Sequence, residues 1–223
     1  MRINGLSLLV DEAVARLDRP ELTRYRRAVV LGSLREDVVY VPVLGRVLEH
    51  LSLSHLYGPP WPGGFVPLLT PGPRLAGTYY FRRAVREYRA GHRAAGFVQL
   101  GRVAHLLSDM ACPVHVHRHV HDTDLFEWYV ESHRQELAQL PPALEPDAHS
   151  PAQLIGALAR FTAGFPGDPT QNRVGRWLRQ RHLVRAPDRR AVAGHARAII
   201  PVAIAHMTAL FRLYLREVEI PGA

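Results

Sequence analysis

The sequence has no lysine and only one cysteine, Cys112. A single cysteine excludes an intramolecular disulfide, and with it the small secreted scaffolds that disulfides hold together. No uninterrupted run reaches the roughly 18 apolar residues that a membrane-spanning helix needs. The first seventeen residues include Asp11 and Glu12 and lack a small-residue cleavage site. We therefore expect no signal peptide there and a cytoplasmic location.

All 28 basic residues are arginine, and they exceed the 20 acidic residues, which gives a net charge of +8. A basic surface attracts anionic partners such as phospholipid headgroups, phosphoesters or nucleic acid, although arginine-only usage is also what a GC-rich genome produces. Histidine is abundant, with 13 residues. Four of them fall within seven positions, at His115, His117, His119 and His121.

The apolar residues recur with a helical period almost throughout, and strand alternation is nearly absent. This pattern predicts helices over residues 6–17, 20–34, 44–53, 74–90, 93–110, 125–140, 151–164, 170–182 and 188–217. Residues 58–73 are rich in proline and glycine, which predicts a long loop, and residues 141–150 form a linker. We find no internal repeat. The expected architecture is a single all-α domain over residues 1–223, a multi-helix bundle.

Two polar residues lie on the apolar face of the helix predicted over 93–110. His105 and Asp109 are four positions apart, a spacing that places their side chains next to each other. Burying a histidine and a carboxylate is costly unless a partner neutralises them. The pair is either a hydrogen-bonded structural device or part of a metal site.

Further residues of the same chemical types accompany this pair. His115 comes ten residues after His105, beyond a proline that ends the helix and turns the chain back. Glu127 lies one turn inside the next predicted helix, Asp37 ends the second helix, and His55 precedes the proline-rich loop. Imidazole nitrogens and carboxylate oxygens of this kind suit zinc without any thiolate.

The run LGRVAHLLSDMACPVH resembles the signature of the zinc-dependent phospholipases C. In that signature a helix carries H-x-x-x-D, and a proline and a second histidine follow. The second histidine comes ten residues after the first, as His115 comes ten residues after His105 here. Three other pieces resemble that family in order: GSLRED ending at Asp37, SHLY at His55, and FEWYV at Glu127. The likeness spans about residues 1–135, and the single-strand-specific zinc nucleases share this helical zinc architecture more distantly.

The resemblance implies an all-helical fold and up to three zinc ions. One zinc would be held by Asp37, His55, His105 and Asp109, and a second by His115, Glu127 and a further histidine, with Asp109 bridging toward a third. Metal-activated water would then attack a phosphoester while the ions offset the charge that develops on the phosphate oxygens. Asp37 is the expected catalytic residue, because a carboxylate beside that water could orient or deprotonate it.

The sequence departs from the family at two positions. Leu6 stands where the family has a histidine ligand of its third zinc, so we expect two zinc ions, or a single one. Thr123 stands where the family has a histidine four residues before the glutamate ligand. His121 is the favoured replacement ligand, and His117, His119 and Asp124 are the alternatives. In an extended loop His115, His117 and His119 would share one side.

The leading hypothesis is therefore a zinc-dependent phosphoric diester hydrolase resembling phospholipase C, acting on a phospholipid at a membrane surface or on a related phosphodiester. One alternative is a single-strand nuclease-like phosphodiesterase, with nucleic acid as the partner. The other is a non-catalytic metal-binding protein that kept part of the site. Substrate and oligomeric state stay open. His195 and His206, on the last predicted helix, are expected to be core histidines.

Overall fold

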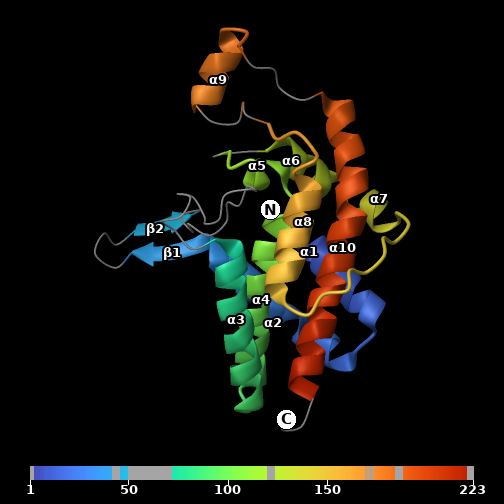
Figure 1. Ribbon diagram of the computed structural model, residues 1–223. Coiled ribbons are helices and arrows are strands. Elements are labelled where there is room, and N and C mark those ends of the chain that lie inside the picture. The colour runs from blue at the N-terminus through green and yellow to red at the C-terminus, as the bar shows by residue number, and fades with distance from the viewer. Residues whose placement is uncertain are drawn as a thin grey trace.

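The computed structural model describes residues 3–41, 46–49, 72–119, 124–168, 170, 173–183 and 188–219. Helices dominate this part of the chain, and they pack lengthwise into a bundle (Figure 1). The helices are α1 (Ile3–Leu17), α2 (Pro20–Asp37), α3 (Pro73–Arg89), α4 (Arg93–Asp109), α5 (Pro113–Val116), α6 (Leu125–Ser132), α7 (Arg134–Ala138), α8 (Pro151–Thr162), α9 (Arg173–Gln180) and α10 (Arg189–Glu219). The all-α class predicted from the helical period is confirmed.

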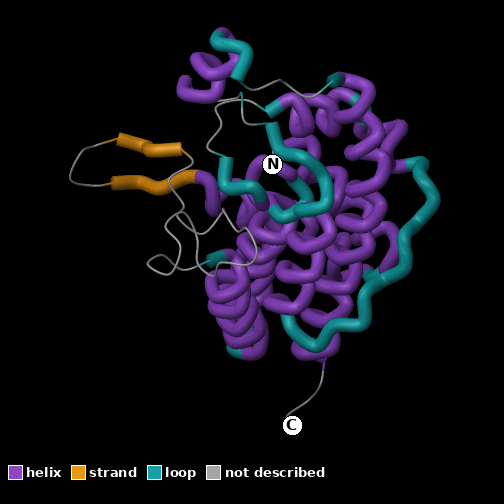
Figure 2. The backbone as a smooth tube through the Cα atoms, turned by 45° about the horizontal axis from the view of Figure 1, so that its top comes forward, coloured by secondary structure: helices purple, strands orange, loops and turns teal. Residues whose placement is uncertain are grey.

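A short antiparallel hairpin corrects the helix that was predicted over 44–53. Strand β1 (Val38–Val41) follows α2 directly and pairs with β2 (Arg46–Glu49), with Val38 opposite Glu49. The hairpin projects to one side of the bundle (Figure 2). The segment VVYV is rich in β-branched and aromatic residues, which favour an extended backbone, and pairing with this strand overrides the weak helical pattern of the second segment.

The helix predicted over 125–140 is divided in two at His133. This residue has non-helical backbone angles, φ −115° and ψ 22°, and it ends α6 and starts α7. Its Nδ1 lies 3.0 Å from the Tyr129 carbonyl oxygen, and its ring stacks on the Tyr129 ring with centroids 4.0 Å apart. These local contacts of the histidine replace the continuation of a single helix.

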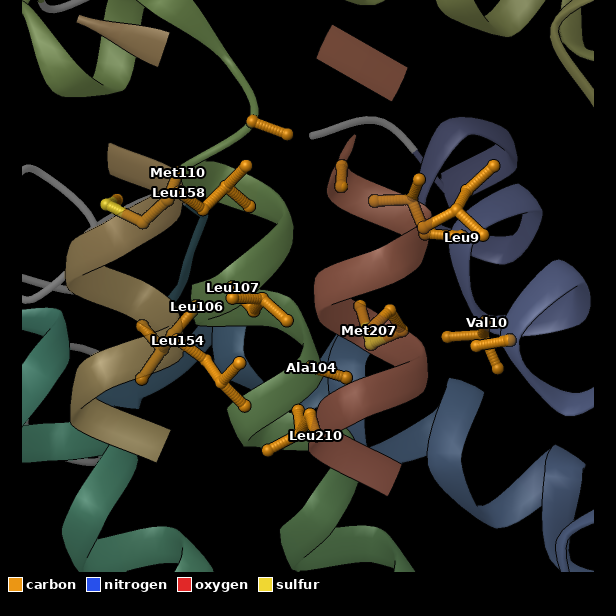
Figure 3. Close-up of a cluster of buried hydrophobic side chains, with 14 of the residues drawn as sticks. Leu9, Val10, Ala104, Leu106, Leu107, Met110, Leu154, Leu158, Met207 and Leu210 are labelled. Carbon is orange, nitrogen blue, oxygen red and sulfur yellow. The ribbon is translucent and has the colours of Figure 1, made fainter. Parts of the chain in front are cut away.

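The centre of the bundle is α4, in which every residue from Val103 to Asp109 is buried. Leucines of α4 and α8, Met207 and Leu210 of α10, and Leu9 and Val10 of α1 converge on one apolar cluster (Figure 3). Since α4 is enclosed by its neighbours, polar side chains on its last two turns lie in the protein interior.

Glycines allow α2 to cross α4 at backbone contact. A Cβ atom on Gly101 would lie 2.1 Å from the Val29 carbonyl oxygen, and one on Gly32 would lie 1.9 Å from the Val98 carbonyl oxygen. The Ser33 hydroxyl donates across this crossing to the Gly101 carbonyl oxygen at 2.8 Å. The crossing fixes α2, which ends at Asp37, against the helix that carries His105 and Asp109.

The C-terminal helix α10 is long and apolar enough for a membrane span by length and composition, with a window of mean hydropathy 1.6. However, 83% of that window is buried inside the molecule. It packs against α1, α4, α6 and α8 and runs the length of the bundle (Figure 1). This burial is what a core helix of the bundle shows.

Helix α9 lies at the end of the molecule that bears α5 (Figure 1). Its sequence RVGRWLRQ contains three arginines and no acidic residue. Trp177 is 49% exposed, and the Arg181 guanidinium lies 4.9 Å from the Trp177 ring centroid. The helix therefore combines positive charge with an exposed aromatic ring.

Candidate metal centre

The site begins with the pair at the end of α4. His105 and Asp109 are both fully buried, and the His105 Nε2 lies 3.2 Å from the Asp109 Oδ2. The i, i+4 spacing on one helix face sets this contact, as the sequence predicted. The Oδ2 atom of Asp109 therefore contacts His105, and the Oδ1 atom can contact a different residue.

A tight turn returns the chain to this second oxygen. The Cys112 amide donates to the Asp109 carbonyl oxygen at 3.0 Å, and Pro113 then starts α5 at a position where a missing N–H costs nothing. His115 on α5 lies with its Nε2 3.8 Å from the Asp109 Oδ1. The prediction that Pro113 returns His115 to the pair is confirmed, and Asp109 faces two histidines, one with each oxygen.

Glu127 closes the site from α6. Asp124 caps this helix, because its Oδ2 accepts the Glu127 amide at 3.1 Å. The Glu127 Oε1 lies 3.7 Å from the His115 Nε2, and both side chains are 8% exposed. Asp124, an alternative ligand in the sequence analysis, thus acts as the cap of α6. The cap sets the start of α6 so that Glu127 in its first turn points at His115.

Cys112 is the functional candidate that the sequence analysis missed. Its thiol donates to the Asp124 Oδ2 at 3.4 Å. The sulfur, one ring nitrogen of His115 and one carboxylate oxygen of Glu127 all lie within 4.8 Å of one another. Burial raises the pKa of the Cys112 thiol, and the neighbouring carboxylates raise it further. Cys112 lies three residues before His115 at the start of a short helix, a spacing that places the two side chains near each other. The sequence could therefore have indicated that Cys112 lies close to the site.

Two neighbouring histidines of the dense run, His117 and His119, lie beside residues 165–167. His117 Nε2 lies 2.7 Å from the Phe165 carbonyl oxygen, and both His117 and His119 pack against Gly167. The extended loop expected here is wrong, because α5 occupies 113–116 and Arg118 adopts a positive φ of 56° that reverses the chain. The expectation that His115, His117 and His119 share one side is wrong for His115, which faces Asp109 and Glu127. The rings of His117 and His119 do stack, with centroids 6.0 Å apart.

Several predicted site residues lie outside the described part of the chain. These are His55, His121, the Thr123 position and most of the 58–73 loop, together with the side chain of Asp37. The backbone of Asp37 is described and ends α2. Leu6, at the position of the family's third-site histidine, is a core residue at 1% exposure.

The two histidines of α10 do not belong to the cluster. His206 is buried, and its Nδ1 lies 2.8 Å from the Val202 carbonyl oxygen. His195 packs edge-on against the Phe165 ring and lines a cavity of about 10 Å³ beside α5 and α6, room for one water molecule. Burial lowers the pKa of both histidines, which favours the neutral form. The expectation of core histidines holds for His206, whereas His195 is partly exposed.

The donor set fits a zinc ion. For tetrahedral zinc with nitrogen and oxygen ligands at about 2.1 Å, neighbouring ligand atoms lie about 3.4 Å apart. The three contacts among His105, Asp109, His115 and Glu127 measure 3.2, 3.7 and 3.8 Å. Each contact is close to that separation, but the contacts link the four residues in series. The described donor atoms that meet as a group, within 4.8 Å of one another, belong to Cys112, His115 and Glu127.

Comparisons with known proteins give fold relatives. The sequence matches no protein-family model and no curated protein. Among solved structures, the alpha toxin of Clostridium absonum superposes with a TM-score of 0.71 at 15% identity, over 100% of this chain and 67% of that one. The Clostridium perfringens alpha-toxin of an avian strain gives 0.63 at 13% identity, over 98% of this chain and 62% of that one. The chain therefore has the all-α bundle fold of the matched part of these alpha toxins.

Proposed function

We propose that this chain is a zinc-dependent phosphoester hydrolase of the phospholipase C type. The observation that carries the proposal is the convergence of His105, Asp109, His115 and Glu127 in the interior of the bundle. Two carboxylates and two imidazoles buried together without bound cations would be costly. Bound zinc ions offset that cost, and the fold likeness to the alpha toxins agrees with the resemblance of the sequence motifs.

The described residues divide between two ion positions. His105 and Asp109, with Asp37 and His55, would hold one ion. His115 and Glu127 would hold a second, and each carboxylate oxygen of Asp109 faces one of the two histidines. The ions would supply Lewis-acid stabilisation of the phosphate charge and a nucleophile near neutral pH.

The protein residues orient the ligands and control the surroundings. The α4 helix and the Asp124 cap hold the imidazole and carboxylate groups in place before substrate binds, which is the preorganisation that electrostatic catalysis requires. We assign Asp37 as the general base, with a carboxylate oxygen that takes the proton of the attacking water.

A phospholipid is the favoured substrate because of the surface near the site. Helix α9 has arginines, an exposed Trp177 and, just beyond its end, an exposed Leu183. A basic helix with an aromatic residue suits the headgroup region of an anionic membrane. This helix lies at the α5 end of the molecule (Figure 1).

The test starts with the metal content of protein purified without a histidine tag, for which we expect about two zinc ions per chain. Hydrolysis of a chromogenic phosphodiester should then be abolished by Asp37→Asn even with zinc added in excess to fill the site. It should be unchanged in the control Asp147→Asn, which alters an exposed linker residue. A protein free of zinc refutes the proposal.

The substrate class is decided by comparing phosphatidylcholine vesicles with single-stranded DNA. Preferential turnover of the vesicles supports a lipase, and preferential turnover of DNA replaces it with a nuclease. Two bound zinc ions without hydrolysis of either substrate would indicate a non-catalytic metal-binding protein.

A further inference from the structure

We propose that Cys112 is a ligand of the second zinc ion, together with His115 and Glu127. The inference rests on the metal centre of the proposed function and extends it to a residue type that the related family does not use there. Because Thr123 stands where the family has a histidine, the second ion lacks one nitrogen ligand. The Cys112 sulfur would take the place of that ligand.

The geometry of the three residues carries the inference. Their ligand atoms lie within 4.8 Å of one another, and all three residues are buried. For zinc with sulfur at about 2.3 Å and nitrogen at about 2.1 Å, tetrahedral ligand atoms lie about 3.6 Å apart. The sulfur must therefore approach its neighbours by at most about 1.2 Å, the size of a side-chain rotation.

The turn between α4 and α5 places the sulfur where it can bind. Cys112 caps α5, with the His115 amide donating to its carbonyl oxygen at 3.1 Å, so the two side chains are held one turn apart. Asp124 draws the sulfur toward α6, because one carboxylate oxygen accepts both the Cys112 thiol and the Glu127 amide. Asp124 is thus a positioning residue that aligns the thiol with Glu127.

With the Cys112 sulfur included, the second ion has three protein ligands of types that zinc binds. Thiolate, imidazole and carboxylate are all zinc ligands, and three protein ligands leave a fourth position open, as in catalytic zinc sites. As the zinc–sulfur bond forms, the sulfur–hydrogen bond breaks and the proton passes to solvent. The nearby His117 uses its Nε2 for the Phe165 carbonyl oxygen, 2.7 Å away.

The experiment uses the protein loaded with cobalt(II) or with zinc, and the single cysteine means that any thiolate signal comes from Cys112. We expect a near-ultraviolet thiolate-to-cobalt charge-transfer band in the wild type. In the zinc protein, X-ray absorption should show a sulfur neighbour at about 2.3 Å beside the nitrogen and oxygen neighbours at about 2.0–2.2 Å. Both measurements need no variant, so a folding defect cannot obscure them.

Variants then test the energetic role of the sulfur. Cys112→Ala should remove the band and weaken the second zinc at least tenfold, whereas Val114→Ala, which trims a buried side chain in the same turn, should keep both. Two bound cobalt ions without the band, or a second-site affinity of Cys112→Ala within twofold of wild type, would overturn the assignment of Cys112 and leave the hydrolase proposal standing. Failure of the wild type to bind any metal would overturn both.

Discussion

The crossing of α2 over α4 offers the sharpest test of how the fold supports the site. In Gly101→Ala, the new Cβ would lie 2.1 Å from the Val29 carbonyl oxygen, whereas ordinary contact begins near 3.4 Å. The helices must separate by about 1.3 Å, because the atom in the way belongs to the backbone and cannot rotate aside. Separation would also stretch the 2.8 Å hydrogen bond from the Ser33 hydroxyl to the Gly101 carbonyl oxygen.

The expected magnitude follows from two opposing effects. Overpacking in a rigid interior costs about 3 kcal/mol at the upper end of its usual range. Alanine in a helix is favoured over glycine by about 1 kcal/mol, which offsets part of that cost. The free energy of unfolding should therefore fall by about 2 kcal/mol, and the second effect can be measured alone at Gly194 in α10, where an added Cβ meets no atom within 4 Å.

Urea unfolding of both variants with a chelator present measures these differences without a contribution from bound metal. Gly101→Ala should lower the midpoint, and Gly194→Ala should raise it by the equivalent of about 1 kcal/mol. Equal stability of Gly101→Ala and wild type, within about 0.5 kcal/mol, would refute the backbone contact between α2 and α4.

Three further predictions concern the site and its surroundings. Asp124→Ala should lower the free energy of unfolding by about 1 kcal/mol, because the cap of α6 is lost. Asp124→Asn keeps an acceptor oxygen and should lower it less. Urea unfolding of both variants without metal measures the difference. Burial lowers the pKa of His206, so the unfolded chain binds more protons than the native protein at acidic pH. The free energy of unfolding, measured with a chelator present, should therefore fall as the pH drops below about 6.5. His206→Asn should make this dependence on pH weaker. Free zinc at a hundredfold excess over its dissociation constant should stabilise the protein by about 2.7 kcal/mol per site, or about 5.4 kcal/mol for two sites. The melting temperature should then rise by roughly 11–22 °C, a gain that Asp109→Asn should lower and a chelator should reverse.

Much of the fold and the centre of the site could be predicted because they depend on local periodicity. The i, i+4 relation between His105 and Asp109 follows from helix geometry alone, and Pro113 marks the turn that returns His115. Glu127 was found through its place one turn into a capped helix. Each of these contacts is set by neighbours close in the sequence.

Two errors arose where contacts between separate segments decide the structure, at residues 46–49 and at Cys112. Residues 46–49 form a strand because a β-branched segment lies opposite them. The end of α6 at His133 was missed for another reason, because it depends on a local stacking contact with Tyr129 that the helical period does not report. Cys112 was set aside because a single cysteine suggests no disulfide. Its proximity to Glu127 depends on the approach of α6, which sequence spacing does not report.

The burial of α4 also bears on how slowly a bound ion would leave. His105 and Asp109 belong to the helix at the centre of the core, so they separate only when that helix loses its packing against the rest of the bundle. Spontaneous metal exchange by ligand detachment is then limited by large-scale opening of the protein, and amides of α4 should be among the last to exchange with deuterium. Substitutions that strengthen the distant core would lengthen the lifetime of the bound metal without touching a ligand.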